Sequence, residues 1–225
     1  MKAEIDLKPK KVGHLYHFIK RGFDLFASSL GIFLLSPILL ILAIAVKCNS
    51  KGPALFKDRR IGRGGIVIIV YKFRSMYIDS ESNITHYLTP EQMEIWERER
   101  KLDNDPRVTK VGKFLRKTSL DELPQLFNIF IGNMSIVGPR PISPREAEEH
   151  FTKEQKDVLL SAKPGLTGYW QVYARNEAEF KTGERQKLEL EYFEKRSLWL
   201  DFKIVFLTIP AVLSHKGVKE WLICF

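Results

Sequence analysis

The sequence predicts an α+β fold that is mostly helical and that rests on one face of a membrane. Three observations indicate this fold: an uncharged apolar run near the N-terminus, two strand-like segments separated by glycines, and a series of segments with helical spacing. The chain has 225 residues, of which 44% are hydrophobic and 28% are charged. It is therefore long enough for one globular domain with a sizeable core in addition to the apolar run.

Three parts are expected along the chain. Residues 1–21 form an N-terminal segment, and residues 22–47 form a re-entrant membrane helix that is broken at Ser36–Pro37. Residues 48–225 form a cytoplasmic domain that acts as a single unit with the membrane helix. We expect this domain to contain a small β-hairpin and amphipathic helices that lie in the membrane interface.

The apolar run "LFASSLGIFLLSPILLILAIAV" has 22 residues without a charge. As a helix it would be about 33 Å long, close to the roughly 30 Å of a bilayer core. A cleaved signal peptide fits poorly, because the run is long and because Glu4, Asp6 and Asp24 precede it. Lysines and arginines flank the run on both sides. A single span can satisfy the positive-inside rule at only one of its ends.

Pro37 lies near the middle of this run. Proline removes one backbone donor and clashes with the preceding turn, so a kink or a break is expected there. Each half would be about 15–18 Å long, enough to enter one leaflet and return. The hydroxyl of Ser36 could satisfy a freed backbone group inside lipid. The charge symmetry favours the re-entrant helix, and a kinked span remains the alternative.

The segment "PALFKDRRIGRGGIVIIVYKFRSM" predicts two strands joined by a turn at Gly62–Gly65. Residues 66–70 are an unbroken β-branched run, which predicts a strand buried on both faces. Thr89 and Gln92 have the spacing of a capping box, with a proline at the first helical position of the segment that follows.

Two helical segments are expected farther along. The segment "SPREAEEHFTKEQKDVLLS" predicts one helix, "AKPGLTGYWQVYAR" is irregular and aromatic-rich, and "LELEYFEKRSLWLDFKIVFLTIPAVL" is helical. From Trp199 onward the last segment is so apolar that it suits either a membrane interface or a packed core. Both interpretations remain open from the residues alone.

The basic excess of the chain, 36 Lys+Arg against 27 Asp+Glu, favours an anionic partner. Nucleic acid, a phosphorylated small molecule and an anionic lipid all satisfy this condition. The two cysteines, Cys48 and Cys224, lack metal-ligand spacing, which indicates a reducing cytosolic setting. The chain contains no Walker A, HExxH or GxSxG motif.

The segment "RKTSLDELPQL" contains two adjacent carboxylates, Asp121 and Glu122. Ser119 and Glu122 have the spacing of a capping box, and Pro124 is tolerated only in a first helical turn. A helix should therefore begin close to Asp121, with its positive end favouring the ionised carboxylates. An ionised aspartate can act as a nucleophile, and a carboxylate pair beside phosphates suits Mg²⁺. Capping and chemistry are both compatible with this segment.

Short basic clusters lie before and after the carboxylate pair. Lys72 and Arg74 belong to "YKFRSM", Arg116 to "GKFLRKTS", and Arg140 to "GPRP". Any of them could be an ordinary solvated surface charge. The prolines on either side of Arg140 fix its backbone, which suits a pre-organised phosphate contact.

Six motifs in a fixed order resemble those of the bacterial polyprenyl-phosphate sugar-phosphate transferases, the small monotopic phosphoglycosyl transferases. They are "LLSPILL", "YKFRSM", "LRKTSLDELPQLFN", "MSIVGPRP", "KPGLTGYWQV" and "SLWLDFKIV", and they cover roughly residues 18 to 217. The resemblance implies transfer of a sugar 1-phosphate from a UDP-sugar to undecaprenyl phosphate, with UMP released. It also implies that this step begins the synthesis of a bacterial surface polysaccharide or glycoconjugate.

The resemblance assigns roles to individual residues. It makes Asp121 the nucleophile that forms a covalent phosphosugar intermediate, and Glu122 its partner in binding Mg²⁺. It places Lys72, Arg74 and Arg116 at the substrate phosphates.

Arg140 and Arg175 are further substrate contacts that the resemblance implies, and Ser36–Pro37 would break the membrane helix. In "VYARN", Ala174 stands where many members of the family have glycine. This departure affects how closely the loop that carries Arg175 follows the family.

The implied partners are the UDP-sugar, undecaprenyl phosphate and the membrane, with no nucleic acid and with homo-oligomerisation left open. The implied location is the bacterial inner membrane, with the active site on the cytoplasmic face. Two other classes remain as alternatives: a membrane-anchored module that binds nucleic acid or another anionic ligand, and a metal-dependent glycosyltransferase. Release of UDP would indicate the glycosyltransferase, and steep salt dependence of binding would indicate the nucleic-acid module.

Overall fold

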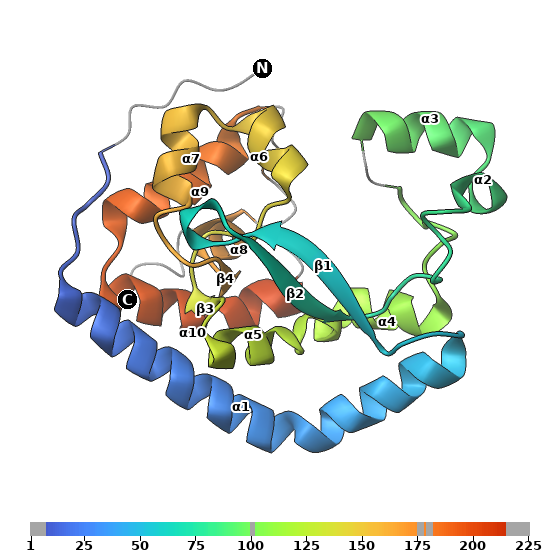
Figure 1. The fold of residues 1–225 in the computed structure, drawn as a ribbon, viewed down its shortest axis with the longest axis horizontal. Coiled ribbons are helices and arrows are strands. Elements are labelled where there is room, and N and C mark those ends of the chain that lie inside the picture. Colours follow the sequence, from blue (N-terminus) through green and yellow to red (C-terminus); the bar gives the residue numbers. More distant parts are fainter. Residues whose placement is uncertain (1–7, 100–101, 175–177, 179–181, 215–225) are drawn as a thin grey trace. The chain divides into compact units, whose positions relative to one another are not determined.

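The computed structural model describes residues 8–99, 102–174, 178 and 182–214. Helices dominate this part of the chain, with two small two-stranded sheets among them (Figure 1). The predicted α+β, mostly helical fold class is confirmed.

The N-terminal helix α1 runs from His14 to Asn49 and contains Pro37. It starts before the apolar run and ends after it. The helical assignment continues across Ser36 and Pro37, so the expected division into two helices is wrong, whereas a kink at the proline stays a prediction. A proline removes one backbone donor, and the turns on either side keep their own hydrogen bonds.

By length and composition, α1 is able to cross a membrane. Only 11% of its most apolar 18-residue window is buried inside the protein. Its exposed side chains include Phe26 at 68% and Phe33 at 76%. The core helix of a soluble protein would bury such side chains. This exposure suggests that α1 associates with a membrane.

The chain divides into two compact units. The larger unit contains residues up to Leu34, Asp58–Val70 and the chain from Gln125 onward, and the smaller unit contains Leu35–Lys57 and Tyr71–Pro124. Helix α1 and both strands of the hairpin contribute residues to each unit.

The predicted hairpin is confirmed. Strand β1 (Leu55–Ile61) pairs with β2 (Val67–Phe73), and a 3-10 turn, η1 (Arg63–Gly65), joins them. Within this turn Gly64 and Gly65 have φ values of 73° and 82°, which other residues adopt only with strain.

The burial predicted for the second strand is wrong. Ile68 and Val70 are 6% and 0% exposed, whereas Ile66 and Val67 are 63% and 51% exposed. Only one face of β2 is therefore covered, as is usual for a hairpin strand.

The smaller unit also contains α2 (Ile84–Tyr87), α3 (Pro90–Glu99), α4 (Lys110–Thr118) and η2 (Leu120–Glu122). The capping box at the start of α3 is confirmed, because Thr89 and Gln92 exchange hydrogen bonds of 3.1 and 3.3 Å. The core of this unit joins the second half of α1 to β2 and α4. Its buried members are Leu42, Val46, Phe73 and Leu115.

The larger unit contains α5 (Gln125–Ile131), β3 (Ser135–Val137), α6 (Pro144–His150), α7 (Lys153–Leu159), β4 (Gly165–Thr167), α8 (Tyr169–Tyr173), α9 (Glu184–Lys195) and α10 (Leu198–Ser214). Strands β3 and β4 pair in parallel, with Ser135 opposite Gly165 and Val137 opposite Thr167. The sequence did not reveal this sheet.

Both long helices expected in this unit are interrupted. The first divides into α6 and α7 because Thr152 and Gln155 form a new capping box after Phe151. The second divides into α9 and α10 at Arg196 and Ser197. The segment expected to be irregular contains β4 and α8.

A polar network fixes the start of α1 to α9 and α10. The hydroxyl of Tyr16 donates to Asp201 at 2.8 Å, and Lys20 lies 2.8 Å from the same carboxylate. Tyr192 donates to the other oxygen of Asp201 at 2.8 Å. Asp24, which is 3% exposed, accepts hydrogen bonds from the hydroxyl of Ser135 and from the backbone N–H that follows it. The polar end of α1 is thus held by the larger unit.

Candidate active site

The predicted carboxylate pair lies on η2, directly after α4. Ser119 has φ 58° and ends α4, with its N–H pointing back to the carbonyl of Arg116. The Ser119 side chain does not cap η2, so the predicted capping box is wrong. A residue in the left-handed region is a typical helix C-terminal cap, and the next α-helix begins only at Gln125.

Two leucines hold this turn in place. Leu120 and Leu123 pack against the core of the smaller unit, which includes Leu115 and Phe73. Asp121 and Glu122 lie between these leucines and are partly exposed. The turn therefore presents two neighbouring carboxylates on a fixed backbone.

Two of the predicted cations lie at the pair. Lys72 of β2 places its ammonium 4.0 Å from Oε1 of Glu122. Arg116 of α4 interacts electrostatically with Asp121 and donates from Nε to the Ser75 hydroxyl at 2.9 Å. The smaller unit thus brings together Lys72, Arg116, Asp121 and Glu122.

The pKa of Asp121 is raised from 3.8 to about 6. Burial is the main cause and the charge of Glu122 adds to it, whereas Lys72 and Arg116 oppose the shift. The expectation that a helix terminus would favour ionisation is therefore wrong, since one 3-10 turn does not outweigh burial beside a like charge. At neutral pH the carboxylate is still mostly ionised.

The donor set of the pair fits Mg²⁺. Among the residues that the structure describes, no cluster of three or more His, Cys, Asp or Glu side chains could hold a metal by itself. Mg²⁺ is usually held by one or two carboxylates together with phosphate oxygens and water. Asp121 and Glu122 supply the carboxylates, and a cation between them would relieve the repulsion that raises the pKa of Asp121.

Arg74 lies elsewhere in the smaller unit and is 5% exposed. Its Nε donates to the carbonyl of Pro53 at 2.7 Å, and its two terminal nitrogens donate to the side chain and the carbonyl of Ser50. All three nitrogens bind the chain that follows α1. This arrangement favours a structural role over the predicted phosphate contact.

Arg140 belongs to the larger unit, and its predicted contact with a substrate phosphate stays a prediction. Its backbone N–H donates to Glu189 at 3.1 Å, and its guanidinium lies 5.4 Å from the ring of Trp170. Arg185 lies 4.2 Å from the same ring, and its pKa is lowered to about 10 by burial and by the charge of Arg140. Arg175 lies outside the described residues.

Two residues that support the site were missed from the sequence. Ser75 accepts the hydrogen bond from Arg116, and its backbone oxygen accepts one from the N–H of Thr109 at 3.0 Å. A Cβ at Gly112 would lie 1.9 Å from that same oxygen. Only glycine allows α4 to approach the chain at Ser75. The motif "YKFRSM" contained a signal for Ser75, but the sequence alone contained none for Gly112.

The chain also contains an Asp-x-Asp triplet, Asp103–Asp105, which is typical of metal-dependent glycosyltransferases. Arg107 binds both oxygens of Asp105, with Nε and a terminal nitrogen at 2.9 and 2.7 Å. Both residues are buried. The second carboxylate of the triplet is therefore engaged in an ion pair inside the protein.

Comparison with known proteins agrees with these motifs. The family model described as "Bacterial sugar transferase" matches residues 15–215. An undecaprenyl-phosphate galactose phosphotransferase of Salmonella typhimurium is 43% identical over 202 residues, 89% of this chain and 41% of that protein. A UDP-glucose:undecaprenyl-phosphate glucose-1-phosphate transferase of Escherichia coli is 42% identical over 203 residues, 88% and 41% of the two chains.

The exopolysaccharide production protein ExoY of Rhizobium meliloti is 42% identical over 200 residues, 88% of this chain and 87% of its own length. The chain thus matches nearly the whole of ExoY. It spans only about two fifths of the Salmonella relative and of an uncharacterized sugar transferase of Haemophilus influenzae. The residues matched by the family model include nearly all of α1, the carboxylate pair and the basic residues around it. The chain therefore belongs to the bacterial sugar transferase family.

Proposed function

We propose that the protein transfers a sugar 1-phosphate from a UDP-sugar to undecaprenyl phosphate, releases UMP, and so initiates synthesis of a bacterial surface polysaccharide or glycoconjugate. The named activities of the Salmonella and Escherichia relatives support this reaction class. The main structural support is Asp121, a partly buried carboxylate with its pKa raised to about 6, which adjoins Glu122 and interacts with Lys72 and Arg116.

In the first step, an oxygen of Asp121 attacks the sugar-linked phosphorus of the donor. A bond forms between that oxygen and phosphorus, and the bond from phosphorus to the UMP oxygen breaks. Burial strips water from the carboxylate and makes it a better nucleophile, and it remains mostly ionised at neutral pH. Lys72 and Arg116 stabilise the charge that spreads over the phosphoryl oxygens.

In the second step, a phosphate oxygen of undecaprenyl phosphate attacks the same phosphorus. The bond to Asp121 breaks, and the carboxylate is restored with the sugar diphosphate now on the lipid. Both steps use one site, so the positions of Lys72 and Arg116 serve both.

Glu122, together with Asp121, would hold Mg²⁺, which would neutralise charge on the substrate phosphates. Glu122→Gln removes one of the two carboxylate charges. We expect the Mg²⁺ concentration for half-maximal activity to rise in this variant while a folded protein is retained. Unchanged Mg²⁺ dependence would contradict the assignment.

We also propose that the enzyme lies on the cytoplasmic face of the inner membrane, with α1 re-entrant. In a chain with Cys48 and Cys224 replaced by serine, single cysteines at Lys10 and at Lys51 should both be shielded from an impermeant thiol reagent in intact cells. Labelling at one of the two sites alone would show that α1 spans the membrane. Pro37→Leu should then shift the labelling towards that of a span.

The released nucleotide distinguishes this reaction from ordinary glycosyl transfer. A panel of UDP-sugars, incubated with enzyme, Mg²⁺ and undecaprenyl phosphate, should give UMP with at least one donor. Release of UDP would indicate a glycosyltransferase that moves the sugar without its phosphate.

A further inference from the structure

A cavity of about 220 Å³ lies in the larger unit beside the first turns of α1. Its lining contains a single carboxylate, Asp24, and that carboxylate already accepts hydrogen bonds from Ser135 and Ile136. The basic residues in the lining are His17, Lys20, Arg21, Arg63, Lys163 and Arg196. None of the residues assigned to the proposed transfer reaction lines this cavity.

Some of these cations have protein partners. Lys20 pairs with Asp201 at 2.8 Å, and Arg196 donates to the carbonyl of Lys10 at 2.9 Å. Arg21 donates to the carbonyls of Ile129 and Phe130 at the end of α5, at 2.7 and 2.8 Å. These bonds hold the cavity wall in shape.

The side chains of Lys163 and Arg63 form no ion pair or hydrogen bond with any other residue that the structure describes. A Cβ at Gly132 would lie 3.3 Å from a terminal nitrogen of Arg21 and 3.6 Å from the ammonium of Lys163, so these two cations converge at one point. Burial and the charges of Arg21 and Arg63 lower the pKa of Lys163. An anion in the cavity would offset this repulsion.

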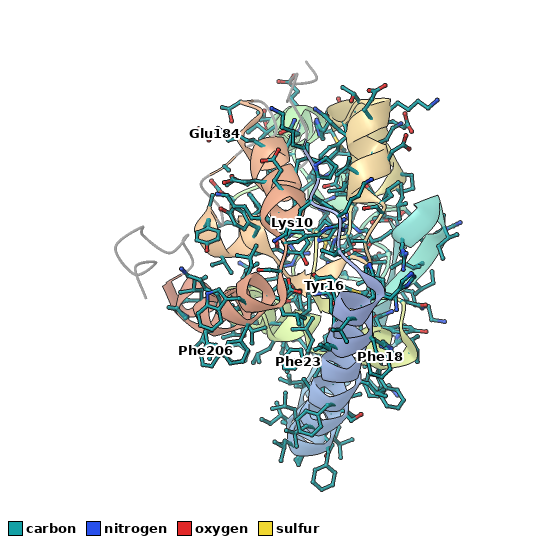
Figure 2. The ribbon with its side chains drawn as sticks, turned by 90° about the vertical axis from the view of Figure 1, so that its left-hand side faces the viewer. Lys10, Tyr16, Phe18, Phe23, Glu184 and Phe206 are labelled. Carbon is teal, nitrogen blue, oxygen red and sulfur yellow. The ribbon has the colours of Figure 1, made fainter. Side chains whose placement is uncertain are left out.

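An apolar groove of about 160 Å³ adjoins the basic cavity, and the two share Lys20 and Asp24 in their linings. The groove is lined mainly by Ile19, Phe23, Val137, Leu198 and Phe202. In Figure 2, Phe18 and Phe23 of α1 and Phe206 of α10 lie at one level, below Tyr16, and all three are at least 40% exposed. Aromatic side chains at one level are typical of a membrane interface.

We propose that the basic cavity binds the phosphate headgroup of an anionic phospholipid, with an acyl chain along the adjoining apolar groove. A phosphodiester would give Lys163 and Arg63 a negatively charged partner. An acyl chain would cover the apolar groove, which a soluble phosphate would leave exposed. The site would fix the depth of α1 in the membrane. It does not depend on the proposed transfer reaction.

The test titrates fluorescent phosphatidylglycerol into the full chain in neutral detergent micelles, with the matched phosphatidylcholine probe as comparison. Lys163→Met keeps the apolar stem, removes the charge and leaves no partner unpaired. Lys11→Met removes the same charge from the exposed segment before α1, outside the cavity. We expect Lys163→Met and Arg63→Met each to weaken phosphatidylglycerol binding about fivefold, with little change in Lys11→Met or for phosphatidylcholine.

Equal losses in Lys163→Met and Lys11→Met would reduce the effect to general surface charge and overturn the proposal. Displacement of phosphatidylglycerol by inorganic phosphate at equal concentration would instead indicate a site for soluble phosphate. Sugar-phosphate transfer in detergent should be unchanged in Lys163→Met. Loss of transfer in the folded variant would make the cavity part of the substrate site and would also overturn the proposal.

Discussion

The ammonium of Lys72 lies 4.0 Å from Oε1 of Glu122, and its charge also acts on Asp121, the neighbouring residue. One lysine thus influences both carboxylates of the pair. Its position on β2, next to the buried Phe73, makes this arrangement part of the core of the smaller unit.

Lys72→Met should raise the pKa of Asp121 further, because the largest opposing charge is lost. The rise of kcat/KM with pH should then move to higher pH than in the wild type. A pH profile of UMP release measures this shift. Lys113→Met, on the exposed face of α4, removes the same charge and should leave the profile in place. Identical pH profiles for the wild type and both variants would show that Lys72 does not affect the ionisation of Asp121.

The raised pKa of Asp121 predicts opposite trends for activity and stability. The Asp121 carboxyl binds its proton more tightly in the folded state than in the unfolded state. The stabilisation from this proton is therefore complete below about pH 3.8 and is lost as the pH rises through about 6. Activity should rise over the same interval, because the ionised form is the nucleophile. Asp121→Asn should therefore be more stable than wild type at neutral pH, by about 1–3 kcal/mol. Denaturant unfolding at several pH values checks this, and a less stable variant at neutral pH would contradict it.

Gly112→Ala should move α4 away from Ser75, because the new Cβ would lie 1.9 Å from a backbone oxygen. Arg116 and Asp121 follow α4, so transfer activity should fall more steeply than the folded fraction. Gly22→Ala is the control, since a Cβ at this helical position meets nothing within 4 Å. That variant should be unchanged or slightly more stable, by about 0.5–1 kcal/mol. Full activity in Gly112→Ala would show that the close approach is dispensable.

Arg116→Lys and Arg74→Lys make the same chemical change at two positions with different surroundings. Arg116→Lys loses the bond to Ser75 and the planar guanidinium at the carboxylates, so kcat/KM should fall roughly 10- to 100-fold with little loss of stability. Arg74→Lys should chiefly lower the melting temperature, because Arg74 binds Ser50 and Pro53. Steady-state kinetics and thermal unfolding of both variants test the contrast. Loss of activity in a stable Arg74→Lys protein would restore its predicted phosphate contact.

Local patterns predicted the local structure. The glycines of the hairpin turn and the Thr89–Gln92 capping box were both identified, since each depends on residues a few positions apart. The pairing of Ser135 with Gly165 depends on chain segments that are distant in sequence, and three-residue strands carry almost no periodic signal. Ser119 shows a related limit, because a serine followed by an acidic residue is compatible with both ends of a helix.

The residues of the site were predicted through the resemblance to a family, and their geometry was not. Spacing alone could not place Lys72 beside Glu122, nor show that Ser75 orients Arg116. The depth of burial that raises the pKa of Asp121 likewise depends on how the core of the smaller unit packs around η2.

A single-turnover experiment tests most directly whether Asp121 is the nucleophile. Enzyme is incubated with Mg²⁺ and a UDP-sugar labelled in the phosphate attached to the sugar, without undecaprenyl phosphate, and is then denatured. The wild-type chain should retain the label covalently and release UMP, and later addition of undecaprenyl phosphate before denaturation should remove the label. Asp121→Asn should remain folded and do neither. Label bound to the folded Asp121→Asn chain would show that another residue is the nucleophile.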